Sequence, residues 1–314
     1  MNFRNMALWS IIGLFVLFIS LFAYTQIKVS RIERKFPPPG EFVSPASQEG
    51  KIHYLREGSG IPVVMLHGRD GALQEFTFSI FNKVANNYEA VALDRPGYGY
   101  SECSDFDKLS LKSQSQLINE TLNELNIENP IMIGHSYGGA VMLQYLLDYP
   151  DQVRGAISLA GVAYVDEPPE ESFFAIPRYP IIGPLITNTL VVPLGRSVAK
   201  GIYKQAFAPS EAPENYVKII SSLYIRPAQF TATAYELAEM HESVSKISQH
   251  YSEITVPVTI IFGNSDQMLD HVKDGRRLYE ALPNARLKLI DNAGHKIHHT
   301  HPEIVMDAID RLAE

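Results

Sequence analysis

The sequence predicts an α/β protein built around a mostly parallel sheet with helices on both faces. A continuous apolar run at 62–68 is typical of a strand that is buried on both sides. Apolar positions then recur at three- and four-residue spacing between Leu109 and Ile127, as on a surface helix. This alternation continues along the chain and implies parallel pairing. The strands are expected at 51–55, 62–68, 88–93, 131–133, 153–159, 256–263 and 286–290.

Composition allows a large folded core and excludes some classes of function. The chain has 314 residues, of which 46% are apolar, enough for one large α/β domain with an insertion or for two small domains. Its net charge is −8 and it has no basic stripe or arm, so nothing supports nucleic-acid binding. The single cysteine, Cys103, excludes an internal disulfide, and no Cys/His spacing suggests a zinc site.

An uncharged apolar segment runs from Ala7 to Ile27. As a helix, its 21 residues would span about 30 Å, the thickness of a bilayer core. Trp9 and Tyr24 stand near its ends, where amphipathic rings prefer the interface. A cleaved signal peptide is the alternative, but no A-x-A site comes after the segment. We therefore expect residues 1–27 to form a single-pass membrane anchor.

The segment after this anchor, residues 28–50, is expected to be a proline-rich linker. Four basic residues come after the span, against Arg4 before it, which would place the C-terminal domain in the cytoplasm. Because a single N-terminal span can also act as a signal anchor that exports the C-terminal domain, the side of the membrane on which this domain lies stays open. The stretch 36–40, Phe-Pro-Pro-Pro-Gly, is expected to be a stiff, non-helical spacer.

The regular strand–helix pattern breaks between residues 162 and 249. Many prolines interrupt this stretch, and short helix-like pieces at 216–224 and 229–240 lie between them. We expect a helical cap or lid at 162–249, inserted into an α/β core formed by residues 51–161 and 250–314. Helices around 272–282 and 303–313 complete this core.

Ser136 lies where an apolar strand meets a helix. The strand 131–133 breaks into Gly-His-Ser-Tyr-Gly-Gly at 134–139, and the helix-competent segment 140–147 comes directly after it. In this context a G-x-S-x-G pattern predicts a nucleophile elbow, in which the serine stands on a strained turn. Gly134 and Gly138 leave room for the strand and helix to approach each other.

Five motifs in this order make residues 51–314 resemble the α/β-hydrolase fold, in the capped group that includes esterases, epoxide hydrolases and dehalogenases. They are His-Gly at 67–68, Asp-Arg-Pro-Gly-Tyr-Gly-Tyr-Ser at 94–101, the elbow at 134–139, Gly-Asn-Ser-Asp at 263–266 and Ala-Gly-His at 293–295. The resemblance implies an eight-stranded, mostly parallel sheet with the helical cap inserted after the sixth strand.

The same resemblance implies a catalytic triad. Ser136 is the expected nucleophile, His295 the base, and Asp266, on the loop after a strand, the acid, in the chain order that this fold uses. His298, His299 and His301 are nearby alternatives to the base. Asp270 could be a solvated loop charge, and Asp166 is a rival acid because some capped hydrolases carry the acid after the sixth strand. Asp94 is expected to shape a turn beside the site.

Two backbone N–H groups are expected to bind the oxyanion. The family uses the residue after the nucleophile, here Tyr137, and the residue after His-Gly, here Arg69. Backbone donors do not depend on the side chain, so an arginine is permitted. Arg69 and Asp70 form a charged pair that would either make a salt bridge at the pocket mouth or touch substrate.

Ser136 at the elbow separates this chain from relatives that need an aspartate nucleophile, so epoxide opening and halide displacement are excluded. We expect a serine hydrolase that cleaves a small or lipid-like carboxylic ester. A serine-dependent C–C bond hydrolase and a cofactor-free peroxidase or perhydrolase are alternatives, and a non-catalytic binding protein is the least favoured. No G-x-G-x-x-G or P-loop pattern is present, so no nucleotide cofactor is expected.

Overall fold

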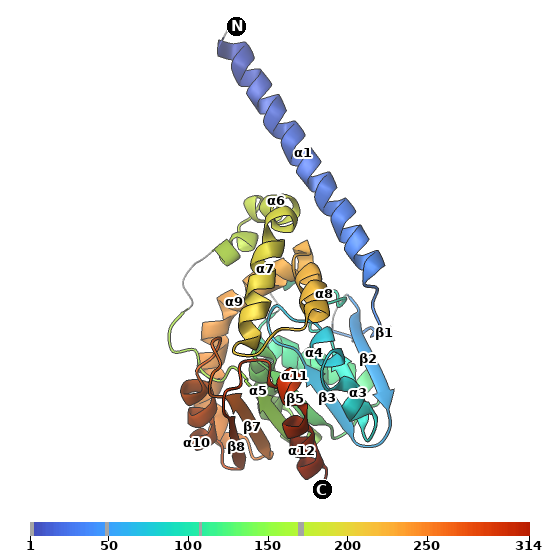
Figure 1. Cartoon of the computed structure of the whole chain (residues 1–314), viewed down its shortest axis with the longest axis vertical. Coiled ribbons are helices and arrows are strands. Elements are labelled where there is room, and N and C mark those ends of the chain that lie inside the picture. The colour runs from blue at the N-terminus through green and yellow to red at the C-terminus, as the bar shows by residue number, and fades with distance from the viewer. Residues whose placement is uncertain (1–2, 48–49, 107–108, 169–172) are drawn as a thin grey trace.

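A computed structural model describes residues 3–47, 50–106, 109–168 and 173–314. Residues 1–2, 48–49 and 169–172, which belong to the predicted anchor, linker and insertion, lie outside the described residues. The chain begins in a long helix, α1 (Phe3–Lys35), that projects from the domain (Figure 1). The sheet lies at the other end of the molecule, and a group of helices stands between the two (Figure 1).

The core is an eight-stranded sheet with the order β1-β2-β4-β3-β5-β6-β7-β8. β1 and β2 pair antiparallel, as do β2 and β4, and all other pairs are parallel. The predicted fold class is therefore confirmed. The strands are β1 (Glu41–Val43), β2 (Ile52–Gly58), β3 (Pro62–Leu66), β4 (Glu89–Leu93), β5 (Ile131–His135), β6 (Gly155–Leu159), β7 (Val258–Gly263) and β8 (Ala285–Ile290).

Helices pack against this sheet and bury its central strands. Every residue of β5 and β6 is buried, as expected for strands covered on both faces. α5 packs on β3, β5 and β6, and α12 also contacts β5 and β6. The helices of the core are α2 (Gln74–Thr77), α3 (Phe81–Ala85), α4 (Leu111–Glu124), α5 (Tyr137–Asp148), α10 (Arg277–Ala281), α11 (Ile297–Thr300) and α12 (Pro302–Ala313). A π-helical turn at His271–Arg276 leads into α10.

The N-terminal region has two features that the sequence did not predict. α1 continues beyond residue 27 to Lys35, because one side of the helix there still packs on the domain. The predicted linker 28–50 also contains β1, which pairs with β2 and forms one edge of the sheet. Only the proline-containing stretch 36–40 between them is non-helical, as predicted.

The segment between β6 and β7 forms a separate helical layer, which we call the cap. Among its described residues no strand occurs, and its helices surround their own apolar cluster. That cluster includes Tyr203, Tyr216, Leu223 and Phe230, so the cap has a core distinct from that of the sheet. The cap helices are α6 (Ile182–Thr189), α7 (Val191–Phe207), α8 (Glu214–Tyr224) and α9 (Pro227–Ile247), after a short 3-10 stretch at Phe173–Arg178.

Candidate active site

Ser136 occupies the sharp turn between β5 and α5. Its backbone has φ 51° and ψ −124°, a region that a non-glycine residue rarely adopts. The turn is held by Ser136 N–H donating to the Leu159 carbonyl at 3.2 Å and by Gly139 N–H donating to the Ser136 carbonyl at 2.8 Å. A Cβ on Gly134 would lie 2.4 Å from the Gly138 oxygen, so this close approach of strand and helix requires glycine.

His295 and Asp266 lie together on the loops after β8 and β7. His295 Nδ1 and Asp266 Oδ2 are 2.8 Å apart. The other oxygen of Asp266 accepts hydrogen bonds from the N–H groups of Met268 at 2.7 Å and Leu269 at 3.1 Å. Burial alone would raise the pKa of Asp266, but His295 and these N–H donors hold it below its usual value. The carboxylate is therefore ionised and fixed, as an orienting acid must be.

Asp166, the rival acid, lies elsewhere. Its side chain is 53% exposed and forms surface ion pairs with Arg277 at 2.8 Å and Lys273 at 3.4 Å. These cations lower the pKa of Asp166. Of the two carboxylates, Asp266 is thus the one that contacts His295.

The loop after β3 brings Arg69 to the elbow. A Cβ on the neighbouring Gly68 would lie 2.8 Å from Ser136 Cβ, which shows how closely the two segments approach. The Arg69 N–H makes no hydrogen bond to the part of the chain that the structure describes. Tyr137 is the first residue of α5, where N–H groups lack partners within the helix. Both predicted oxyanion donors therefore belong to segments that border Ser136.

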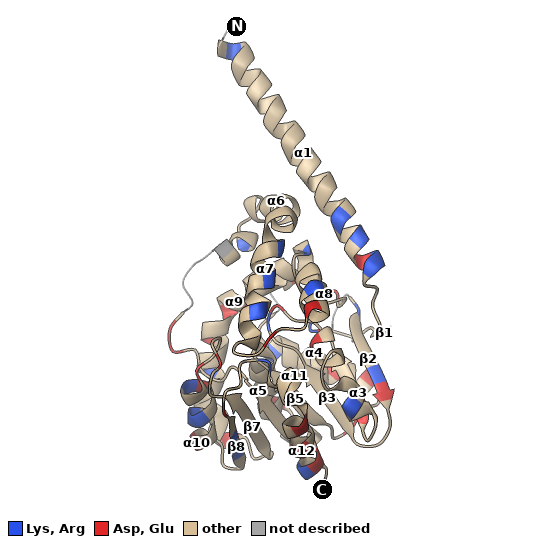
Figure 2. Cartoon of the chain, in the orientation of Figure 1, with Lys and Arg blue, Asp and Glu red and all other residues tan. Residues whose placement is uncertain are grey.

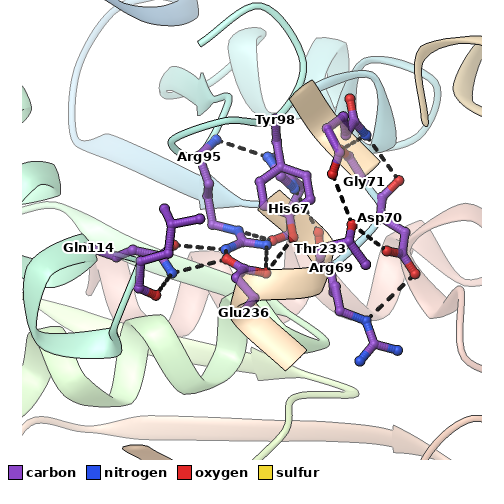
Figure 3. Close-up of polar contacts among 12 residues, drawn as sticks. His67, Arg69, Asp70, Gly71, Arg95, Tyr98, Gln114, Thr233 and Glu236 are labelled. Carbon is purple, nitrogen blue, oxygen red and sulfur yellow. Dashed lines mark hydrogen bonds and ion pairs between the residues drawn. The ribbon is translucent and has the colours of Figure 1, made fainter. Parts of the chain in front are cut away.

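Arg69 and Asp70 form the salt bridge that was one of the two arrangements expected for them. The ion pair is loose, with 3.6 Å between Arg69 Nε and Asp70 Oδ2. Two residues of the cap donate hydrogen bonds to this loop. Thr233 Oγ1 donates to Asp70 Oδ1 at 2.9 Å (Figure 3). Gln229 Nε2 donates to the Gly71 carbonyl, also at 2.9 Å. The oxyanion loop is thus attached to α9 of the cap.

Ser136 and His295 open into one cavity of about 370 Å³ between the sheet and the cap. One part of its wall is apolar and includes Val162, Ile202, Ala206, Met240 and Leu269. Another part carries charge, with Arg69, Asp70, Asp270, Lys273 and Asp274. The cavity therefore suits a ligand that has both an apolar and a polar end.

A buried glutamate, Glu75, joins the segments around the serine. It accepts a hydrogen bond from the Gly68 N–H at 3.2 Å, and its Oε1 lies 2.7 Å from His135 Nδ1. The ammonium group of Lys296 contacts the same oxygen. Burial alone would raise the pKa of Glu75, but His135 and Lys296 hold it well below its usual range. One carboxylate thus links the oxyanion loop, the elbow and the residue after His295.

No pattern in the sequence indicated this cluster, and its atoms resemble a set of metal ligands. Glu75, His135 and His298 could offer donor atoms within 4.8 Å of one another. However, Lys296 already supplies a positive charge to the Glu75 carboxylate and would repel a metal cation. We therefore interpret the cluster as a structural centre beside the site.

A second buried group joins the cap to the core. Arg95, just after β4, pairs with Glu236 of α9, and both side chains are fully buried (Figure 3). Gln114 and Tyr98 donate to the same carboxylate at 3.0 and 2.6 Å. Arg95 Nε also donates to the His67 carbonyl at 2.9 Å, immediately before the oxyanion loop. The ion pair therefore couples the position of α9 to that of the loop.

Asp94 has the structural role expected from the sequence. One of its oxygens accepts the Leu73 N–H at 2.7 Å, and the other accepts the Tyr100 N–H at 2.8 Å and lies 2.6 Å from His53 Nδ1. These bonds tie the 94–101 turn to β2 and to the segment that precedes α2.

We expect the protein to lose stability as the pH falls from about 6.5 to about 4. Burial lowers the pKa of His67 and His135 to about 4 and that of His298 to about 3, from 6.5. In that range the unfolded chain binds protons that the folded chain does not, so acid favours unfolding. Denaturant titrations at pH 7 and 5 measure the effect.

A His298→Asn variant should show a weaker pH dependence of its unfolding midpoint than the wild type. His250→Gln, a change at an exposed position, should leave the dependence unaltered. An unfolding midpoint that does not change between pH 7 and 5 would contradict the assignment of these histidines as neutral groups.

Comparison with known proteins identifies similar chains. Residues 61–302 match the sequence profile of the family described as "alpha/beta hydrolase fold". Monoacylglycerol lipase ABHD6 of Mus musculus is 25% identical, over 77% of this chain and 72% of the relative. A 2-hydroxy-6-oxononadienedioate/2-hydroxy-6-oxononatrienedioate hydrolase of Cupriavidus pinatubonensis is 28% identical, over 81% of this chain and 87% of the relative.

Solved structures agree with this match at the level of the fold. An esterase from Exiguobacterium antarcticum superposes with a TM-score of 0.69 at 23% identity, and the alignment covers 87% of this chain and 99% of the esterase. An epoxide hydrolase, CorEH, superposes with a TM-score of 0.68 at 21% identity, over 87% of this chain and 98% of the hydrolase.

Proposed function

Because this chain belongs to the α/β-hydrolase family, we propose that it is a serine hydrolase that cleaves a carboxylic ester through an acyl-enzyme. The observation that carries this proposal is the arrangement of three side chains. Ser136 stands on a strained turn that opens into the same cavity as His295, and His295 is paired with the buried, ionised Asp266. This combination suits nucleophilic catalysis.

In the proposed reaction, Ser136 Oγ attacks the ester carbonyl while Nε2 of His295 takes the serine proton. Asp266 keeps the other imidazole nitrogen protonated and stabilises the imidazolium. The N–H groups of Arg69 and Tyr137 would bind the oxyanion. His295 then gives the proton to the leaving alcohol. Water, activated by His295, hydrolyses the acyl-enzyme and releases the acid.

A lipid-like ester is the substrate class that the cavity favours. Beside the main cavity lies a smaller one of about 110 Å³, and Ile202 lines both. The walls of the smaller cavity are apolar and include Leu190, Leu194, Val198 and Phe230 of the cap. Such a path can hold an acyl chain, while the charged part of the main cavity receives the polar end of the substrate. The name of the mouse relative, a monoacylglycerol lipase, points the same way.

We further propose that α1 anchors the enzyme in a membrane and that residues 162–249 act as a lid. α1 has 33 residues, and its most apolar part has a mean hydropathy of 2.4 and is exposed. Lys and Arg gather at the end of α1 that adjoins the domain (Figure 2). Hydrophobic residues in contact with lipid, with basic residues after them at the interface, are typical of a single-pass helix.

Hydrolysis of a C–C bond in a diketone is a second candidate. The Cupriavidus relative is named as a hydrolase of a dioate, and Arg69 and Lys273 in the cavity could bind a carboxylate. The two candidates differ in the bond that is cleaved. Turnover of a synthetic dienedioate diketone faster than of any p-nitrophenyl ester would favour the second.

Labelling with a fluorophosphonate probe tests the nucleophile. We expect the wild-type protein to be labelled and the Ser136→Ala variant to remain unlabelled, because the probe reacts with an activated serine. Ser158→Ala, which changes a buried serine of β6, should label like the wild type. Equal labelling of Ser136→Ala and wild type would overturn the proposal.

A series of p-nitrophenyl esters from acetate to palmitate tests the acyl pocket. We expect kcat/KM to rise with chain length up to a medium or long chain, because each buried CH₂ contributes about 0.8 kcal/mol. A preference for acetate over all longer esters would contradict the assignment of a lipid-like substrate.

A further inference from the structure

One face of α1 packs against the cap at the end of the apolar segment. Thr25 is fully buried, and Phe18 and Leu21 are partly buried, at spacings of three and four residues. The same face continues with Val29 and Ile32, which pack on the apolar cluster of the cap. α1 contacts α6, α7 and α8 (Figure 1). The cap is therefore held beside the C-terminal half of the helix that we propose to cross the bilayer.

The position of α6 beside α1 sets the depth of α6 relative to the bilayer. α6 contacts α1 and stands nearer to the N-terminal end of α1 than the other labelled cap helices do (Figure 1), so α6 lies at the depth of the interface or deeper if α1 spans the membrane with residues 7–27. The surface of the cap there is apolar and exposed, with Ile181 84%, Ile182 55%, Leu194 65% and Val198 60% exposed. In water such a patch is costly, whereas at a bilayer surface it is buried among acyl chains.

A basic pocket lies beside this apolar surface, between α1 and the cap. It has a volume of about 190 Å³. Lys28, Arg31 and Lys35 line it from α1, and Arg196 lines it from α7. No acidic side chain lines the pocket, and none of these four cations forms an ion pair with a described residue. The one acidic residue of this part of α1, Glu33, pairs instead with Arg226 at 3.2 Å.

The height of this pocket fits a lipid headgroup. Lys28 and Arg31 lie one and four residues after the last apolar residue of the span, Ile27, or about 1.5 and 6 Å along a helix. The headgroup layer occupies the first 5–8 Å or so beyond the hydrocarbon core. Arg196 reaches the same pocket from a helix whose neighbouring residues, Leu194 and Val198, are exposed and apolar.

We propose that the junction of α1 and the cap binds anionic phospholipid. The headgroup phosphate lies in the pocket lined by Lys28, Arg31, Lys35 and Arg196, and the exposed apolar residues of α6 and α7 lie among the acyl chains. This inference rests on the proposed membrane anchoring but not on the ester hydrolysis. Together, the basic pocket and the apolar surface of the cap would hold the smaller cavity against the bilayer at Leu194 and Val198, which line it.

The test compares lipids bound to the full chain in nanodiscs of equal parts phosphatidylglycerol and phosphatidylcholine. After release into a neutral detergent, native mass spectrometry measures the lipids retained. We expect phosphatidylglycerol to be enriched on the wild type. In the double variant Arg31→Gln/Arg196→Gln the enrichment should fall roughly thirtyfold, because each of the two cations near an anionic surface contributes about 1 kcal/mol.

The matched control is Lys200→Gln/Lys204→Gln, which removes the same charge from exposed positions of α7 that do not line the pocket. It should keep the enrichment. Equal losses in both double variants would show a general charge effect and overturn the site, as would full retention in Arg31→Gln/Arg196→Gln.

Fluorescence quenching tests the second part of the proposal, that the apolar residues of α6 lie among the acyl chains. A fluorophore on Ile182→Cys, in a Cys103→Ser background, should be quenched by phosphatidylcholine that carries a nitroxide on its acyl chain. The same fluorophore on Lys288→Cys, on the exposed side of β8, should not be quenched. No difference between the two would overturn the placement of α6. Hydrolysis of p-nitrophenyl acetate by these variants, and extraction of the chain by alkaline carbonate, report separately on the catalytic and anchoring proposals.

Discussion

Replacing Asp266 with Asn is expected to lower kcat for ester hydrolysis by about 10⁴-fold with little change in KM. An amide cannot hold His295 in the tautomer that accepts the serine proton, nor stabilise the imidazolium that forms. The loss should appear in the chemical step, because Asp266 is buried behind His295. Stopped-flow measurement of the acylation rate with a p-nitrophenyl ester checks this result.

Asp166 provides the matched control, since it is the acid that the sequence also allowed. Its side chain lies in surface ion pairs with Lys273 and Arg277. Exposed pairs of this kind contribute about 0–1 kcal/mol, so Asp166→Asn should leave kcat almost unchanged. A large loss in Asp166→Asn together with a small one in Asp266→Asn would reverse the assignment of the acid.

Replacing Glu236 with Gln is expected to destabilise the protein by about 3–5 kcal/mol. The change leaves the guanidinium of Arg95 buried without its carboxylate partner, and Tyr98 loses a charged acceptor. Denaturant titration in a neutral detergent, monitored by tyrosine and tryptophan fluorescence, measures the shift in the unfolding midpoint. Because Arg95 also holds the His67 carbonyl, we expect the folded variant to lose kcat as well.

Glu242→Gln is the control for this experiment, because Glu242 lies on the same helix but is exposed. It removes the same charge and should leave both the unfolding midpoint and kcat near those of the wild type. If the two variants unfold at the same denaturant concentration, the buried pair does not contribute to the attachment of the cap.

Local sequence was sufficient to predict the elbow, because the residues that the turn requires are close together in the chain. Gly134, Ser136 and Gly138 lie within five residues, and the strain of the turn permits few alternatives there. The strand runs and the order of the motifs likewise predicted the sheet and the position of the insertion. His295 and Asp266 could be proposed because each comes after a predicted strand of the sheet.

The N-terminal region shows where pattern was insufficient. Apolar character ends at residue 27, where the expected linker begins. Helical structure instead continues to Lys35, because Val29 and Ile32 pack on the cap. Likewise, β1 is only three residues long, too short for an alternating pattern to reveal it. It is a strand because it pairs with β2.

The sequence by itself determined the class of fold, the nucleophile turn and the chemistry that an elbow serine allows, since these depend on neighbouring residues. Only the tertiary structure decided which carboxylate lies against His295 and which buried charges support the site. Glu75 reaches Lys296 across 221 residues, and Arg95 reaches Glu236 across 141. A lone Glu or Arg in sequence is usually a solvated surface residue. What makes these four different is burial beside an opposite charge, which exists only after the cap and the sheet have packed.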